Sequence, residues 1–421
     1  MKRGLVFCGG GAKGSYEAGV WKYLDEKGIK FDIVTGTSIG ALNAAMYAQH
    51  TFDLDMEVWD IVTLDKIMKD AFKYDENVSL KYSLKQKDNL IGFLGSYIKK
   101  LGGDVSPFYE LMDKYIFPEK IISSDVICGI VVTKFPSFQG KEIVLNNLKP
   151  ELVNKYLVAT ASAFPILQVC KIGRESYIDG GYYDNMPVNF AIELGAQDIV
   201  AVDLSPNITH KEFLNKSFIK YIYPRWSLGG FLKFDREQIK RNFDLGYIDA
   251  RKAYGELMGF KYAFNIVEDN GMSRNFILEI VKVINYMNKN KIKSNVKPEI
   301  EGDIYHILEN STTRPLTDFE YYIRAVEIAG EFMALDHFKV YDLDDFITKL
   351  HQSLAEVSVP ENLFEGYNRL KNINKKKDFV SRISSQPLLK YVLQKNLSIE
   401  EMSILAASKP KVFIIYLLLR S

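Results

Sequence analysis

The chain has 421 residues, which is enough for one large domain with a smaller one, or for two to three ordinary domains. Hydrophobic residues make up 47% and charged residues 25%, a globular composition, and the net charge of +1 gives no support for a nucleic-acid-binding surface. The cysteines, Cys8, Cys128 and Cys170, are odd in number and lie in apolar surroundings, so we expect a reducing compartment and no disulfide framework.

The apolar stretches at the two ends of the chain are short. Leu5–Cys8 is too short for a signal peptide, and Val412–Leu419 is far shorter than a membrane span. We therefore expect a soluble cytoplasmic protein that can still contact a membrane surface peripherally.

The first fifty residues alternate between strand-like and helix-like segments. A short apolar strand at 4–8 leads into the glycine loop Gly9–Gly14, and a helix follows from Ser15 to near Gly28. A second strand at 31–34 and an Ala-rich helix at 41–48 complete a βαβα order. This order predicts a parallel sheet with helices on its faces and ligands beyond the carboxyl ends of its strands.

A serine turn joins that second strand to the Ala-rich helix. The stretch Gly36-Thr37-Ser38-Ile39-Gly40 reads G-x-S-x-G. Glycines on both sides of a serine remove the Cβ atoms that would clash in a sharp strand-to-helix turn. The hydroxyl of Ser38 would then stand at a helix N-terminus, where a nucleophile is exposed and developing negative charge is favoured. A plain glycine-flanked turn is the alternative, and the strand–turn–helix context favours catalysis.

The middle of the first domain combines helices and strands. Residues 51–103 read as amphipathic helix, and the apolar part at 90–101 predicts a helix packed on the sheet, with a lid or a lipid-facing helix as alternatives. A strand is expected at 125–133 with a hairpin partner at 142–145, and a helix from Leu152 should stop before Pro165.

The later sequence changes character after a second group of strands. We expect a strand at 176–179, a buried strand at 198–203 and a helix from Phe243 that closes the first domain. Residues 1–263 would form the catalytic domain, with 51–103 as a helical insertion, and residues 264–421 a mostly helical region. That region could be a lid, a dimerisation element, a ligand sensor or a docking surface, and we expect 412–419 to be a buried terminal helix.

A serine nucleophile needs a base, and the histidines offer a poor one. His50 lies at the far end of the helix that follows the serine, and three other histidines lie in the helical C-terminal region. Only His210, in a polar linker, is not excluded by its position.

Asp179 is the better candidate for the base. It ends a strand and precedes Gly180 and Gly181, whose tight backbone lets the carboxylate approach Ser38. A partly desolvated carboxylate can accept the serine proton directly. An ordinary Asp-Gly turn is the plain alternative for Asp179, and Asp184 is the rival carboxylate.

The glycine loop Gly9–Gly14 can supply an oxyanion hole, because successive N–H groups before a helix form an anion-binding concavity. The favoured donors are Gly10, Gly11 and Ala12, and the N–H of Ile39 is a further candidate.

The role of Lys13 is open, and the glycine loop also has to be compared with known nucleotide-binding loops. Lys13 either steadies the loop, contacts a lipid phosphate or is simply solvated. The loop also fits the dinucleotide fingerprint G-x-G-x-x-G, but that fold needs an acidic residue at the end of the second strand, and Asp32 lies at its start. The loop has no G-K-[ST] at P-loop spacing either.

Taken in order, the motifs Gly9–Gly14, Gly36–Gly40 and Asp179–Gly181 resemble those of the patatin-like phospholipase family. Secondary features at 104–107, 159–165, 185–188 and 246–250 are similar to the family as well. The resemblance covers about residues 1–260. The third motif reads D-G-G where some family members have D-G-A.

The resemblance implies a three-layer α/β/α fold with a central, mainly parallel sheet. It further implies a Ser-Asp dyad, with Ser38 as nucleophile and Asp179 as base, and an oxyanion hole in the glycine loop. The implied reaction is hydrolysis of a fatty acyl ester through an acyl-Ser38 intermediate, with no metal and no cofactor.

The leading hypothesis is therefore a lipid acyl hydrolase of the phospholipase A or lysophospholipase type, with an acyl-ester lipid as its substrate. The same dyad would also serve a neutral-lipid hydrolase or an acyltransferase. From a different class, a lipid-binding regulatory module is the remaining alternative. Head group, acyl position and oligomeric state are not encoded in these motifs.

Overall fold

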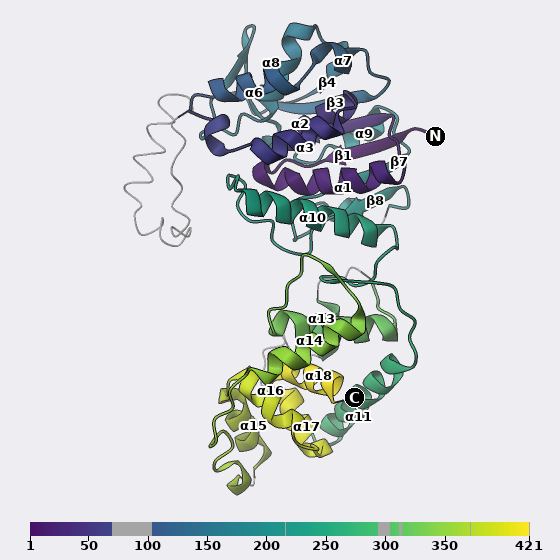
Figure 1. Ribbon diagram of the computed structural model, residues 1–421, viewed down its shortest axis with the longest axis vertical. Coiled ribbons are helices and arrows are strands. Elements are labelled where there is room, and N and C mark those ends of the chain that lie inside the picture. Colours follow the sequence, from purple (N-terminus) through teal and green to yellow (C-terminus); the bar gives the residue numbers. More distant parts are fainter. Residues whose placement is uncertain (70–102, 215, 294–303, 311–313, 371, 421) are drawn as a thin grey trace. The chain divides into compact units, whose positions relative to one another are not determined.

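The computed structural model describes residues 1–69, 103–214, 216–293, 304–310, 314–370 and 372–420 (Figure 1). The chain divides into two compact units, Met1–Tyr254 and Gly255–Ser421. This boundary lies earlier in the chain than residue 263, where the sequence suggested that the first domain ends. The reason is that β9 (Ala263–Phe264) pairs with β10 (Val340–Tyr341) and so belongs to the second unit.

A mixed sheet forms the centre of the first unit. In the described part of this unit it has eight strands: seven follow the order β5-β6-β3-β2-β1-β7-β8, and β4 pairs with β3. The strands are β1 (Arg3–Phe7), β2 (Ile33–Thr37), β3 (Ile127–Lys134), β4 (Gly140–Val144), β5 (Cys170–Ile172), β6 (Glu175–Asp179), β7 (Asp198–Val202) and β8 (Ile219–Ile222). The run β3-β2-β1-β7-β8 is parallel, whereas β4 and β6 run antiparallel to β3. The predicted mainly parallel sheet is confirmed.

Helices cover both faces of this sheet. They are α1 (Ser15–Glu26), α2 (Ile39–Ala48), α3 (Phe52–Ile61), α6 (Ser106–Tyr115), α7 (Pro118–Ile122), α8 (Pro150–Thr160), α9 (Val188–Glu193) and α10 (Arg236–Ala253). A Cβ on Gly36 would meet the backbone of α2, whereas one on Gly4 would meet Ala191 of α9. Gly36 pairs with Phe7, which points to the face opposite Gly4, so α2 and α9 lie on opposite faces of a three-layer α/β/α unit.

Some predicted boundaries differ from the structure. The helix expected from Phe243 begins at Arg236, because Asp235 caps it by accepting the N–H of Gln238 at 2.9 Å. The short edge strand β8 was not anticipated. The segment at 90–101, with its packed-helix, lid and lipid-facing alternatives, lies outside the described residues.

The second unit is built mainly of helices, as expected. They are α11 (Met272–Lys289), α12 (Ile304–Glu309), α13 (Asp318–Phe332), α14 (Leu343–Ala355), α15 (Ile373–Arg382), α16 (Ser385–Leu393), α17 (Ile399–Ser408) and α18 (Pro410–Leu419). The residues 412–419 of α18 are all buried, which confirms the predicted buried terminal helix. Each helix in the described ranges is too short or too polar to cross a bilayer.

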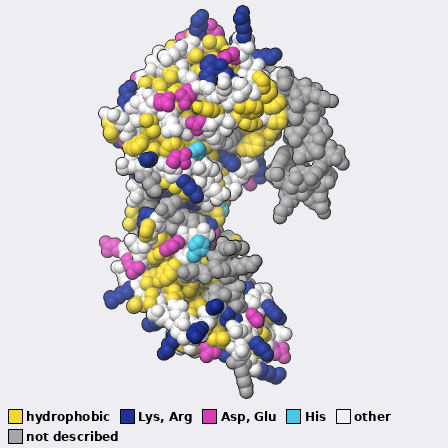
Figure 2. Space-filling model, turned by 180° about the vertical axis from the view of Figure 1, so that it is seen from behind, with side chains coloured by type: hydrophobic (Ala, Val, Ile, Leu, Met, Phe, Trp, Pro, Cys, Tyr) yellow, Lys and Arg dark blue, Asp and Glu magenta, His cyan; other side chains and the backbone are white. Residues whose placement is uncertain are grey.

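A buried ion pair organises one side of this unit. Arg324 and Glu327, one turn apart on α13, are 3% and 0% exposed. Glu327 Oε1 also accepts the backbone N–H groups of residues 260–262 at 2.6–2.9 Å. The charge of the carboxylate is thus fully compensated. On the face seen in Figure 2, basic and acidic side chains are interspersed in both units, in keeping with the net charge of +1.

Candidate active site

Ser38 stands at a strained corner between β2 and α2. Its backbone has φ 54° and ψ −123°, a conformation that is uncommon for a residue with a side chain. The turn is tight enough that a Cβ on Gly40 would lie 2.7 Å from the carbonyl oxygen of Phe7, so only glycine lets α2 approach β1 this closely. The structure thus has the predicted strand–turn–helix geometry, with Gly36 and Thr37 at the end of β2 and Ile39 opening the helix.

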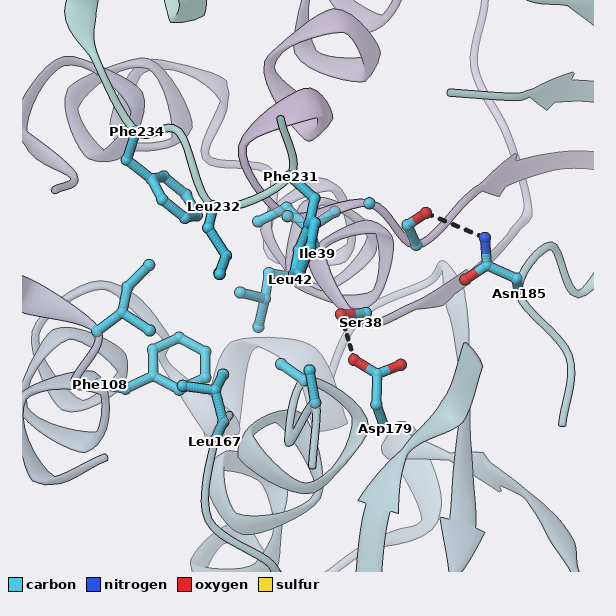
Figure 3. A pocket seen from close by; sticks show the side chains of 16 residues that line it. Ser38, Ile39, Leu42, Phe108, Leu167, Asp179, Asn185, Phe231, Leu232 and Phe234 are labelled. Atoms are coloured by element: carbon cyan, nitrogen blue, oxygen red, sulfur yellow. Dashed lines mark hydrogen bonds between the residues drawn. The ribbon is translucent and has the colours of Figure 1, made fainter. Parts of the chain in front are cut away.

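The hydroxyl of Ser38 donates a hydrogen bond to Asp179. The distance from Oγ to Oδ2 is 2.7 Å (Figure 3). The other carboxylate oxygen of Asp179 accepts the N–H of Gly181 at 2.7 Å. Asp179 ends β6 and is 8% exposed, and this burial raises the pKa of its carboxyl to about 6, although both hydrogen bonds lower it. The carboxylate is therefore ionised at neutral pH, yet more basic than an exposed one.

Gly180, next in the base loop, allows a close approach of Asp179 to the sheet. A Cβ at this position would lie 2.1 Å from the carbonyl oxygen of Val131 on β3. The sequence-predicted pair Ser38 and Asp179 is thus brought into direct contact from segments that are 141 residues apart.

The glycine loop lines the same cavity as Ser38 and Asp179. Some of its N–H groups are already hydrogen-bonded within the protein. Gly9 donates to the carbonyl oxygen of Asn185 at 2.9 Å, Ala12 donates to Phe231 at 2.8 Å, and Lys13 donates to Gly10 at 3.3 Å. Among the described residues, the N–H groups of Gly10 and Gly11 have no acceptor. Of the three donors expected for the oxyanion hole, only these two therefore remain. The prediction for Ala12 is wrong, because the loop just before α10 accepts its N–H.

The structure also shows the surroundings of the other residues predicted for the oxyanion hole. Gly14 offers its carbonyl oxygen to Asn43 at 3.1 Å, and the side chain of Lys13 is half-buried. The N–H of Ile39, at the first turn of α2, donates to no acceptor within the described ranges and stays a candidate third donor. Gly11 has φ +58°, and a Cβ there would lie 2.1 Å from the carbonyl oxygen of Phe231, so glycine is required.

Asn185 ties the glycine loop to the base loop. Its side-chain amide donates to the carbonyl oxygen of Gly9 at 3.0 Å (Figure 3) and also to Cys8 Sγ at 3.1 Å. The neighbouring carbonyl oxygen of Asp184 accepts the hydroxyl of Thr37 at 2.8 Å. The sequence reasoning noted Asn185 only as part of a family-like stretch and did not anticipate its contact with the glycine loop.

Thr160, at the end of α8, holds the backbone of the elbow. Its hydroxyl accepts the N–H of Ser38 at 3.0 Å and donates to the carbonyl oxygen of Val131 at 2.5 Å. The N–H of Ser38 is consequently unavailable to a substrate. The sequence reasoning noted Thr160 only as part of a family-like stretch that ends at a proline and did not anticipate its contact with Ser38.

A buried carboxyl group joins the glycine loop to the helix that carries the nucleophile. Glu17 on α1 is fully buried and accepts the N–H of Cys8 at 2.6 Å and the side-chain amide of Asn43 at 2.8 Å. Asn43 belongs to α2. Burial raises the pKa of Glu17 well above its usual value, and the two donors lower it.

The alternative bases lie elsewhere. His210 Nδ1 is 3.3 Å from Glu212, and His50 Nε2 is 3.0 Å from Asp125 at an exposed position. Asp184 uses Oδ1 to accept the N–H of Met186 at 3.0 Å. Within the described part of the chain, no three or more His, Cys, Asp or Glu side chains are grouped so that they could hold a metal ion.

Ser38 opens onto a cavity of about 200 Å³ with a largely apolar wall. Figure 3 shows hydrophobic side chains from several elements converging beside the serine. The hydrophobic lining consists of Ile39, Leu42, Ile67, Phe108, Ala161, Ala163, Leu167, Phe231, Leu232 and Phe234. Polar side chains in the wall are Ser38, Asp179 and Asn185, all at the glycine-loop end. The cavity suits an aliphatic chain whose polar end lies at Ser38.

A smaller cavity of about 50 Å³ shares five lining residues with the first. Asp55 on α3 lines it and is 2% exposed. Its Oδ2 has no hydrogen-bond partner among the described residues, and burial raises its pKa to about 8. The carboxyl group is therefore mostly protonated at neutral pH.

Comparison with known proteins finds a family match within the first unit. Residues 5–192 match the family model described as patatin-like phospholipase. A patatin-like phospholipase domain-containing protein of Caenorhabditis elegans is 50% identical over 203 residues, which are 48% of this chain and 13% of that protein. Lysophospholipase nte1 of Aspergillus oryzae is 54% identical over 218 residues, which are 48% of this chain and 12% of that protein.

The chain thus spans a small part of the length of the curated relatives it matches. Among solved structures, the crystal structure of VipD from Legionella pneumophila matches with a TM-score of 0.41 and 14% identity, covering 100% of this chain and 90% of that one. The family match includes the glycine loop, the Ser38 elbow and Asp179. Over residues 5–192, this chain is similar to the patatin-like phospholipase family.

Proposed function

We propose that the protein is a serine lipid acyl hydrolase of the phospholipase A or lysophospholipase type, with Ser38 as nucleophile and Asp179 as base. The observation that carries this proposal is the 2.7 Å hydrogen bond from Ser38 Oγ to the buried carboxylate of Asp179, at the polar end of an apolar cavity. The family match and the name of the fungal relatives, lysophospholipase, support a lipid ester as substrate.

In the first half of the proposed reaction, the Ser38 oxygen attacks the ester carbonyl carbon while its proton moves to Asp179 Oδ2. The N–H groups of Gly10 and Gly11 receive the negative charge that develops on the carbonyl oxygen. Collapse of this intermediate breaks the bond to the alcohol. The leaving alkoxide takes the proton back from Asp179, and the acyl group stays on Ser38.

In the second half, Asp179 removes a proton from a water molecule that attacks the acyl-Ser38 ester. The same two N–H groups stabilise the second oxyanion. Its collapse releases the fatty acid, and the proton returns from Asp179 to Ser38 Oγ. An alcohol acceptor in place of water would give acyl transfer with the same residues.

The raised pKa of Asp179 fits the role of a base that works without histidine. A carboxylate with a pKa of about 6 accepts a proton more readily than one at the ordinary value of 3.8 and is still ionised at neutral pH. Burial causes both the higher basicity and the exclusion of bulk water.

The test is fatty-acid release from mixed phospholipid and lysophospholipid vesicles, followed by mass spectrometry. We expect release by the wild-type protein and a loss of about a thousandfold or more in Ser38→Ala and Asp179→Asn. Asp184→Asn is the matched control, because that carboxyl group caps its own loop, and it should keep most of the activity. Equal release by Ser38→Ala and the wild type would refute the proposal, and a lipid-binding module would release nothing.

A further inference from the structure

An exposed group of aromatic side chains surrounds the loop that carries Asp179. This aromatic patch consists of Phe135, Phe138, Phe164, Tyr182 and Tyr183. Three of these side chains are unusually exposed for their type: Phe138 is 53%, Tyr182 50% and Tyr183 58% exposed. They come from three separate segments: the β3–β4 turn, the loop after α8 and the loop after β6.

The patch is a connected structure and not a chance scatter of surface residues. The ring centroids of Phe138 and Tyr182 are 6.0 Å apart, those of Phe135 and Phe138 are 6.3 Å apart, and those of Phe135 and Phe164 are 5.3 Å apart. The hydroxyl of Tyr182 donates to the carbonyl oxygen of Phe164. Tyr183 packs against the β3–β4 turn, where a Cβ on residue 140 would collide with its ring.

Phe138 lies at the tip of this turn in an unfavourable backbone conformation. Its φ is 57°, a region that costs a residue with a side chain energy that glycine or asparagine largely avoids. Folding stability gains little from a half-exposed phenylalanine at a strained position. An exposed phenylalanine in a strained backbone conformation points to a function in binding and not in folding stability.

The patch adjoins segments that line the catalytic cavity. Ala163, which lines the cavity, directly precedes Phe164, and Tyr182 follows Asp179 by three residues. Phe231, on the glycine-loop side of the same cavity, is 44% exposed. Exposed aromatic side chains therefore occur both in the cavity wall and in segments that adjoin residues of that wall.

The charges beside the patch are largely compensated. Lys134 and Lys141, which flank the turn, both place Nζ against the carboxylate of Glu175, at 2.5 Å and 3.4 Å. The patch therefore offers amphipathic rings rather than a net positive field. Such rings favour the interfacial zone of a bilayer, where one side of the ring is apolar and the other is wet.

We propose that the aromatic patch is the surface by which the protein docks on a lipid bilayer, with the cavity mouth facing the membrane. The proposal rests on the proposed function, because a lipid hydrolase must take single molecules out of a bilayer. Docking here would let an acyl chain pass from the membrane into the apolar cavity without crossing bulk water. It predicts binding to uncharged vesicles that persists when salt is raised.

The test uses the substitution Phe138→Asn, which removes the ring and suits a left-handed backbone. Partition onto phosphatidylcholine vesicles is measured by co-sedimentation in a Ser38→Ala background, so that no lipid is consumed. We expect partition to fall about tenfold, the contribution of burying one aromatic side chain in an apolar zone. Phe218→Asn is the matched control, since Phe218 is 38% exposed in the first unit but lies outside the patch, and it should bind normally.

Two further readouts separate this proposal from its alternatives. In the active protein, Phe138→Asn should cut hydrolysis of vesicle lipid about tenfold and leave hydrolysis of a water-soluble short-chain ester unchanged. The midpoint of thermal unfolding should be equal or higher, which a structural role for Phe138 would not allow. Unaltered vesicle partition by Phe138→Asn would overturn the proposal, as would binding that requires anionic lipid or is lost at high salt.

These experiments test the docking surface and the catalytic dyad separately. If the short-chain ester is not hydrolysed by any form of the protein, the proposed function fails whatever the vesicle result. If the ester is hydrolysed but the patch variant binds vesicles like the wild type, only the docking surface is wrong. A patch that captures a protein and not vesicles would likewise overturn docking on lipid.

Discussion

Thr160 Oγ1 accepts the backbone N–H of Ser38 at 3.0 Å, although the two residues are 122 positions apart. The same hydroxyl donates to Val131 on β3, so one buried side chain fixes the strained elbow to the central sheet. Thr160 does not face the reacting atoms, and its effect on the reaction must pass through the position of Ser38. It is a positioning residue.

The hydrogen bond between Ser38 and Thr160 predicts what happens when the hydroxyl group of Thr160 is removed. Thr160→Val keeps the shape of the side chain but leaves a buried N–H and a carbonyl group unsatisfied, which costs about 1–3 kcal/mol of stability. We expect kcat to fall by about tenfold to a hundredfold, because Ser38 shifts, with little change in KM. Thr160→Ser keeps the hydroxyl and should restore kcat. A Thr160→Ser variant as slow as Thr160→Val would show that packing of the methyl group, and not the hydrogen bond, matters.

The glycine loop gives a second prediction, at a position where glycine is required. A Cβ on Gly11 would lie 2.1 Å from the carbonyl oxygen of Phe231, so Gly11→Ala must displace the donors of the oxyanion hole. We expect kcat to drop about a hundredfold to a thousandfold. Gly28→Ala is the control, since φ there is also positive, at +66°, but nothing lies within 4 Å of the added Cβ. Near-normal kcat in Gly11→Ala would mean that Gly10 and Gly11 do not stabilise the oxyanion.

The acidic limb of the pH–rate profile should belong to Asp179. A base with a pKa of about 6 must lose its proton to work, so kcat/KM should rise with pH, bend near pH 6 and stay level above it. The measurement is kcat/KM on a neutral short-chain ester from about pH 4 to about pH 8. An activity that bends near the ordinary carboxyl value of 3.8 would contradict the assignment of a desolvated base.

The raised carboxyl pKa values also predict a pH dependence of stability. An acid whose folded pKa exceeds its unfolded value destabilises the folded state as pH rises from the unfolded pKa to the folded one. For Asp179 this window runs from 3.8 to about 6, and for Asp55 it runs from 3.8 to about 8. Asp179→Asn should therefore gain stability relative to the wild type only up to about pH 6, by up to about 3 kcal/mol. Asp55→Asn should keep gaining to about pH 8.

Urea unfolding at a series of pH values measures these differences. The non-titrating Asn variants leave the shape of each site almost unchanged, so the pH dependence of the difference isolates the carboxyl group. If both variants level off at the same pH, the contrast between the two carboxyl environments is incorrect. If stability falls in the variants instead, the buried carboxylates stabilise the fold.

The dyad could be predicted because each half has a local signature. Ser38 follows the end of β2 and Asp179 ends β6, and both residues lie next to glycines. Because β6 runs antiparallel to β3, its pairing with β3 brings Asp179 to Ser38. The absence of a well-placed histidine in the sequence left the carboxylate as the candidate base. The order of the strands was not needed for this inference.

Contacts between distant segments could not be predicted in the same way. Nothing near Ala12 indicates that the carbonyl group of Phe231 occupies its N–H, because this bond depends on how the loop before α10 folds over the glycine loop. The roles of Thr160 and Asn185 likewise depend on the packing of whole elements. Asp55 is one charged residue of a stretch predicted to be an amphipathic helix, and only the tertiary structure shows that it is buried.

The most direct test of the account is to find which serine is the activated nucleophile. The protein is treated with a fluorophosphonate probe, and the modified peptide is identified by mass spectrometry. The account predicts labelling at Ser38, no labelling in Ser38→Ala and much slower labelling in Asp179→Asn. Labelling of a different serine, or equally fast labelling in Asp179→Asn, would contradict the central claim that Asp179 activates Ser38.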